Sequence, residues 1–281
     1  EWAAAALGNL AVSADNQALI AEAGAIPPLV ELLRSSGDYV RGWAAEALGE
    51  LAKNAGNKAL IAEPGGIPPL VSCLTTGTDI TTRHFAAQAL GHLMADWIVV
   101  DGEFVPMPEA TEIAEANQAS IASAGAIEPL IALLLTNVRP ALQAAAAQAL
   151  RPFSSREDTR VAIVEAGGIS VLAKLLTRCE PAHQHGVVGI LDDLAENVEN
   201  VAAIVEAEAV PGLVELMGDR GTDRGQEAAA ELLLKLCAHP QGLSEAKASG
   251  ALDVAAELET SGTPAAQEAA KRLVALLRPG R

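Results

Sequence analysis

Aromatic residues are scarce in this chain, which has three tryptophans, three phenylalanines and one tyrosine in 281 residues. Half of the residues are nevertheless apolar, and Ala, Leu, Val and Ile supply nearly all of them. β-Sheets favour aromatic and β-branched side chains, whereas Ala and Leu are strong helix formers. The composition therefore argues against a sheet protein and predicts closely packed helices.

Basic residues are also few: 19 Lys and Arg stand against 36 Asp and Glu, which gives a net charge of −17. A surface of this charge repels phosphate backbones and anionic lipid headgroups, so we expect no nucleic-acid partner. A basic protein segment is the better electrostatic match. No apolar run reaches the ~18 residues that a membrane span needs, so we also expect no direct insertion into a membrane.

Cysteine is rare too, and Cys73, Cys179 and Cys237 are odd in number and far apart. This pattern argues against the disulfide framework of a secreted domain, and no signal peptide is visible. We therefore expect a cytoplasmic or nuclear protein. The opening Glu1-Trp2 already reads as the middle of a helix, so we expect the chain to be part of a longer protein.

One short string recurs along the chain. Ala-Gly-Ala-Ile-Pro-Pro-Leu-Val at 23–30 returns as Pro-Gly-Gly-Ile-Pro-Pro-Leu-Val at 64–71 and as Ala-Gly-Ala-Ile-Glu-Pro-Leu-Ile at 124–131. Weaker copies follow later in the chain. The positions equivalent to the first glycine are Gly24, Gly65, Gly125, Gly167, Glu208 and Gly250, separated by 41, 60, 42, 41 and 42 residues. A nearly constant period of this size indicates a repeat protein.

Each repeat is predicted to contain three helices. The first helix is expected over Asn16–Ala23, and Gly24 follows as the glycine just past its end. Pro27 and Pro28 open the second helix, where a missing backbone donor is tolerated. The third helix is expected from Asp38 to about Asn54, and its apolar residues recur with helical spacing. They are Val40, Ala44, Ala47, Leu48 and Leu51.

A unit that combines Gly-x-Ile-Pro-x-Leu-Val with Ala-Ala-x-Ala-Leu-Gly resembles an armadillo repeat, and the resemblance covers essentially the whole chain. It implies an all-α fold: a right-handed α-solenoid of tandem three-helix armadillo repeats, forming one array over 1–281 with about six repeats and partial units at the ends. Such arrays present a long concave surface, lined in this family by the third helices. The resemblance therefore implies a non-enzymatic scaffold that binds an extended, basic peptide or a partner surface along this groove. Alternatives are a karyopherin-like cargo adaptor and a structural subunit of a large assembly. The oligomeric state stays open.

The residues of the predicted groove differ from those of nuclear import adaptors. Armadillo proteins that bind basic signals carry Asn near the end of the third helix and Trp four residues earlier. Here the Asn position holds Asn9, Glu50, His92, Pro152, Asp193 and Lys235, and the Trp position holds Ala5, Glu46, Gln88, Gln148, Gly189 and Glu231. Only Asn9 matches, so the import-adaptor pattern is absent.

Three of the seven aromatic residues occupy another repeated position, seven residues before the Asn position: Trp2, Trp43 and Phe85. With Glu46 and Glu50 beside them, they are suited to the aliphatic stems and cationic heads of a basic peptide. Alternatively, the rings pack between adjacent third helices, because they lie close to the core face. The candidate peptide-binding residues are Trp2, Asn9, Trp43, Glu46, Glu50, Phe85, Gln88, His92, Gln148 and Asp193.

The single long step of 60 residues holds an insertion near 96–115. Two β-prone runs, Trp97–Val100 and Glu103–Pro106, are joined by Asp101-Gly102, which is a strong hairpin signal. We expect a short hairpin or loop at the edge of the groove, followed by a lengthened first helix over Glu109–Ala122. The insertion either contacts a ligand or is a solvated excursion.

No constellation in the sequence favours catalysis. Cys179, His183 and His185 match no familiar metal-ligand spacing, and no phosphate loop or nucleophile motif is present. We therefore expect no enzyme activity, no metal and no cofactor.

Overall fold

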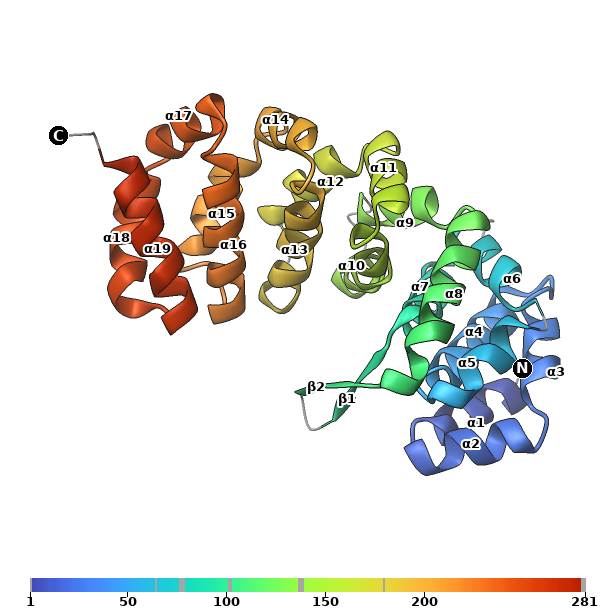
Figure 1. Cartoon of the computed structure of the whole chain (residues 1–281). Helices are drawn as coiled ribbons and strands as arrows, with labels where there is room; N and C mark the ends of the chain where they lie inside the picture. The colour runs from blue at the N-terminus through green and yellow to red at the C-terminus, as the bar shows by residue number, and fades with distance from the viewer. Residues whose placement is uncertain are drawn as a thin grey trace. The chain divides into compact units, whose positions relative to one another are not determined.

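The computed structural model describes residues 2–63, 65–75, 79–100, 103–135, 139–178 and 180–278. These residues form nineteen α-helices, two 3-10 helices and one two-stranded sheet (Figure 1). The all-α solenoid of three-helix repeats is thus confirmed. The chain divides into two compact units, Glu1–Thr159 and Arg160–Arg281, called here the first and second units.

The first unit begins with α1, which occupies the place of a third helix, and continues with helices in groups of three. Their bounds are α1 Trp2–Ala11; α2 Ala14–Glu22, α3 Ile26–Leu32 and α4 Asp38–Leu51; α5 Ala55–Ala62, α6 Ile67–Ser72 and α7 Ile80–Met94; and η1 Pro108–Ala110, α8 Thr111–Ser123, α9 Ile127–Leu134 and α10 Pro140–Ser154.

The second unit follows the same order, and the boundary between the units falls inside α11. The bounds are α11 Glu157–Glu165, α12 Gly168–Leu176, η2 Pro181–His183 and α13 Gln184–Leu194; α14 Val198–Glu206, α15 Ala209–Met217 and α16 Asp223–Leu236; and α17 Pro240–Ala248, α18 Ala251–Ser261 and α19 Pro264–Leu277.

The repeated glycine separates the first and second helices as the sequence predicts. It has a positive φ of 75–80° in all five repeats that carry it, a conformation that glycine adopts without steric cost. Glu208, the equivalent residue in the remaining repeat, also has a positive φ, of 61°. The backbone therefore makes the same turn even where the glycine is missing.

The third helices pack side by side within each unit: α1, α4, α7 and α10 in the first, and α13, α16 and α19 in the second. Ala44, Ala47, Leu48 and Leu51 of α4 are fully buried, as predicted, whereas Val40 is only half-buried. A Cβ added at Gly49 would lie 3.3 Å from the Cα of Ala89. The backbones of α4 and α7 therefore approach closely because the contact residue has no side chain.

The predicted hairpin is present after α7. Strands β1 (Trp97–Val100) and β2 (Glu103–Pro106) pair antiparallel, with Trp97 opposite Pro106 and Val100 opposite Glu103. The expected Asp101-Gly102 turn lies outside the described residues. At the base, the Met107 N–H donates to the Asp96 carbonyl over 2.5 Å, and Met107 is buried. The strands project from the helices of the first unit (Figure 1).

Within the described part of the chain, no helix has the length and apolar character required to span a membrane.

Candidate peptide-binding surface

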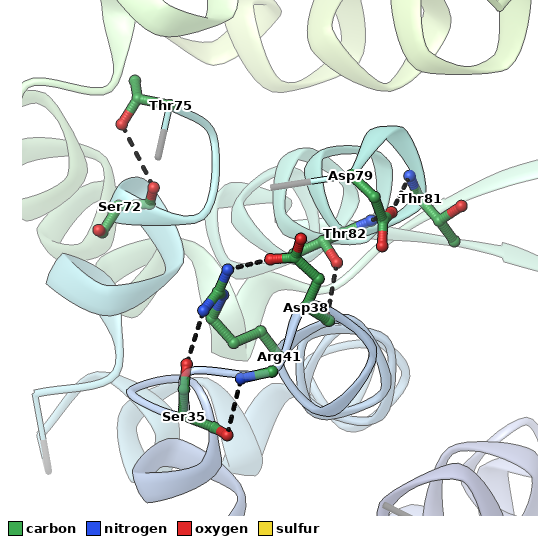
Figure 2. A network of polar contacts seen from close by, with 9 residues as sticks. Ser35, Asp38, Arg41, Ser72, Thr75, Asp79, Thr81 and Thr82 are labelled. Atoms are coloured by element: carbon green, nitrogen blue, oxygen red, sulfur yellow. Dashed lines mark hydrogen bonds and ion pairs between the residues drawn. The ribbon is translucent and has the colours of Figure 1, made fainter. Parts of the chain in front are cut away.

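A polar network at the beginnings of α4 and α7 aligns these two third helices (Figure 2). The Arg41 guanidinium donates to the Ser35 carbonyl over 2.6 Å and forms an ion pair with the Asp38 carboxylate. The Thr82 hydroxyl donates to the Asp38 carbonyl over 2.9 Å. Asp79 caps α7 by accepting from the Thr82 N–H over 2.9 Å. The bond between Thr82 and Asp38 joins the first turns of the two helices, and the other contacts hold each of these turns in place.

This alignment brings together two of the three predicted aromatic residues. The rings of Trp43 and Phe85 stack with centroids 6.4 Å apart and an angle of 30° between their planes, and both residues are half-buried. The axes of helices that pack side by side typically lie ~8–10 Å apart. The two rings lie closer to each other than this spacing. The two rings thus contact each other from neighbouring third helices, and both residues keep part of their surface exposed, so packing and binding both stay predictions for this pair.

Two carboxylates follow Trp43 along α4. Glu50 is held by Lys53, whose ammonium donates to it over 2.7 Å. Glu46 forms no ion pair with any residue that the structure describes, and it is half-buried. Its pKa is raised above the ordinary value, first by burial and then by the nearby Glu50 charge. A cation that reached Glu46 would favour the charged form of the carboxylate and so oppose both effects.

His92 was a candidate groove residue, but its ring is used within the protein. Nδ1 lies 2.8 Å from the Gly49 carbonyl, and since a carbonyl only accepts, Nδ1 carries the proton. Burial lowers the His92 pKa to about 4, against the opposing effect of that hydrogen bond. The imidazole is therefore neutral at pH 7 and links α7 to α4.

Sequence reasoning missed a set of hydrogen bonds by which the first helix of a repeat holds two third helices, that of its own repeat and that of the repeat before. The first helix of a repeat carries a side chain that donates to the backbone carbonyl at the end of the third helix of the same repeat. The fully buried Lys58 donates to the His92 carbonyl, Gln118 to Pro152 over 2.5 Å, and Arg160 to Asp193 over 3.0 Å. The sequence does carry a sign of these bonds, because the three donors are polar residues that directly follow Asn57, Asn117 and Thr159. Those three residues themselves donate to the end of the preceding third helix.

The remaining candidate residues differ in exposure. Trp2 is 82% exposed, and Asn9 and Gln148 are also exposed, whereas Gln88 and Asp193 are half-buried. The structure thus stacks Trp43 of α4 on Phe85 of α7 and places Glu46 and Glu50 further along α4. Of the other candidates, Gln88 and His92 lie on α7, Trp2 and Asn9 on α1, Gln148 on α10 and Asp193 on α13.

The second unit carries ion pairs between its third helices. Lys235 of α16 stands at the position of Glu50, and its ammonium lies 3.0 Å from Asp192 and 2.5 Å from Glu196, both near the end of α13 or just beyond it. Arg272 of α19 lies 3.6 Å from Glu231 of α16.

No group of three or more metal-ligating side chains occurs among the described residues. Cys179, the first member of the loose Cys/His pattern, lies outside them.

Comparison with known proteins agrees with this architecture. The HEAT repeats family matches residues 1–91. Among solved structures, an engineered protein is 29% identical, with a TM-score of 0.71 over 90% of this chain and 96% of the other. A computationally designed armadillo repeat protein for modular peptide recognition is 20% identical, with a TM-score of 0.74 over 90% of this chain and 100% of the other. A designed armadillo repeat protein in complex with the peptide (KR)4 is 20% identical, with a TM-score of 0.70 over 90% of this chain and 99% of the other. No curated protein matches the sequence. The chain is an α-solenoid of the armadillo and HEAT repeat type.

Proposed function

We propose that this chain is a non-enzymatic scaffold in the cytoplasm or nucleus that binds an extended basic peptide on the third helices of the first unit. The observation that carries the proposal is the stacked, partly exposed Trp43–Phe85 pair with Glu46 beside it on α4. An aromatic face binds the stem of Lys or Arg, and a carboxylate without a cation attracts its charged head.

Two further observations support the proposal. The net charge of −17 favours the approach of a basic partner over long range. The designed armadillo protein bound to (KR)4 has the same fold at a TM-score of 0.70. At 20% identity that likeness concerns the fold alone, so the residue chemistry rests on the side chains of this chain.

The test is a binding titration of a labelled peptide of alternating Lys and Arg, followed by fluorescence anisotropy. Trp43→Ala removes an aromatic anchor, which typically costs ~2 kcal/mol, or about 30-fold in Kd. Glu46→Gln removes the charge and keeps the shape, and we expect it to weaken binding about three- to tenfold. The wild-type affinity should fall as salt rises.

Glu22→Gln is the matched control, since it removes the same charge from an exposed residue of the first helix α2. Thermal unfolding of every variant accompanies the titrations. If Trp43→Ala strongly destabilises the fold while Glu46→Gln binds as tightly as Glu22→Gln, the aromatic pair is structural and the proposal fails.

A further inference from the structure

The acidic residues of the two units are neutralised to different extents. In the first unit, Glu46 has no cation within the described residues, as shown above. In the second unit, two cations of the chain itself reach the acids of the preceding third helix: Lys235 contacts Asp192 and Glu196, and Arg272 contacts Glu231.

Lys235 and Arg272 stand at the equivalents of two candidate binding positions. Lys235 corresponds to Glu50. Arg272 corresponds to Glu46, because α16 and α19 bury matching sets of residues, such as Leu233 and Val274, in the same order. Within the second unit, Lys235 and Arg272 therefore occupy the helix positions that Glu50 and Glu46 occupy in the first, and each neutralises an acid of its own unit.

Lys235 forms a good hydrogen bond with only one of its two acidic partners. Its ammonium donates to Glu196 over 2.5 Å and thereby lowers the pKa of that carboxyl below its ordinary value. The Oδ1 atom of Asp192 is buried and accepts no well-formed hydrogen bond, although Lys235 lies 3.0 Å away. Asp192 therefore has an acceptor oxygen that a differently placed cationic donor would satisfy better.

We propose that Lys235, assisted by Arg272, acts as an autoinhibitory side chain that occupies a cation site on the second unit and confines a basic peptide to the first unit. This inference rests on the proposed function. A peptide Lys or Arg arriving at Asp192 or Glu196 must displace Lys235, and the exchange of one cation for another brings little net gain. At Glu46 no cation of the described residues has to be displaced.

The experiment measures binding of the same Lys/Arg peptide in a Glu46→Gln background, in which the first-unit site is weakened. Lys235→Gln frees Asp192 and Glu196, and Lys235→Met repeats the change with an apolar stem that keeps the packing. Lys174→Gln is the matched control, because it removes the same charge from an exposed residue of α12. The ion pairs of Lys235 are partly exposed, so we expect both Lys235 variants to raise affinity about two- to fivefold over the control.

The two ideas fail in different ways. If the Lys235 variants bind no better than Lys174→Gln while Glu46→Gln still weakens the otherwise wild-type protein, the autoinhibition is refuted and the proposed function stands. If Glu46→Gln has no effect but the Lys235 variants gain affinity, the first-unit site is refuted and the second-unit cation site is supported. If no variant binds the peptide, both are refuted.

Discussion

Replacing Lys58 by Gln should stabilise this protein at neutral pH. Lys58 is fully buried in α5, and its ammonium donates to the His92 carbonyl. Burial lowers its pKa from 10.5 to about 8, although the nearby Asp96 charge partly offsets the effect. At ~1.4 kcal/mol per pKa unit, this difference amounts to ~3 kcal/mol of destabilisation when the side chain is charged.

The chain itself contains the replacement. Gln118 lies at the equivalent position one repeat later, and its amide reaches the Pro152 carbonyl over 2.5 Å. Glutamine therefore keeps the hydrogen bond without the buried charge. Its side chain is also one atom shorter, and a loss of packing on the order of one methylene costs ~0.8 kcal/mol, so we expect Lys58→Gln to gain about 2 kcal/mol at pH 7.

The pH dependence distinguishes this explanation from a simple packing effect. Because the pKa of Lys58 is lower in the folded than in the unfolded chain, the unfolded chain binds more protons between pH 8 and 10.5. The stability of the wild type should therefore rise across this window as the buried ammonium loses its proton. The advantage of Lys58→Gln should shrink over the same window.

Urea unfolding of the wild type, Lys58→Gln and the control Lys174→Gln across this pH range measures both quantities. Because Lys174 is exposed, the free energy of unfolding of Lys174→Gln should differ from that of the wild type by a nearly constant amount across this pH range. A Lys58→Gln variant that is less stable at pH 7, or a difference that does not change with pH, would refute the desolvation argument.

Two further predictions concern single features of the fold. Replacing Trp97–Pro106 by Asn-Gly should change the free energy of unfolding by less than about 1 kcal/mol, because Asp96 and Met107 already lie together and a shorter loop is easier to close. Thermal unfolding measures this change, and unfolding of the first unit in the variant would show that the hairpin supports the fold. Glu208→Gly should stabilise the second unit by about 0.5–1 kcal/mol in urea unfolding, because a non-glycine residue with φ of 61° is strained. If the variant is instead less stable than the wild type, Glu208 bears no such strain.

The repeat architecture could be predicted from the sequence because its signals are local. The glycine of each repeat permits a positive φ, the following prolines suit the first turn of a helix, and the apolar residues recur with helical spacing. The α4 helix therefore begins at Asp38 as predicted, although it ends at Leu51, before the expected Asn54. Asp-Gly between two β-prone runs similarly predicted the hairpin.

The candidate binding site could be predicted only in part, because its members meet across repeats. Sequence spacing placed Trp43 and Phe85 at equivalent positions but gave no distance, and their stacking depends on how closely α4 and α7 approach. That approach is set by Gly49 against Ala89 and by the bond from Thr82 to Asp38.

The sequence by itself determined the helices, their order and the turn between the first and second helix of each repeat, since these follow from backbone preferences within a few residues. Only the tertiary structure decided which polar groups are already engaged. His92 bonds to the Gly49 carbonyl, Lys58 to the His92 carbonyl and Lys235 to Asp192 and Glu196, whereas Glu46 has no such partner in the described chain. Each of the first three contacts joins residues more than thirty positions apart. Such pairs form only when helices distant in sequence pack together, within one repeat for Lys58 and His92 and between repeats for the other two, so no local sequence pattern reveals which charges remain available to a ligand.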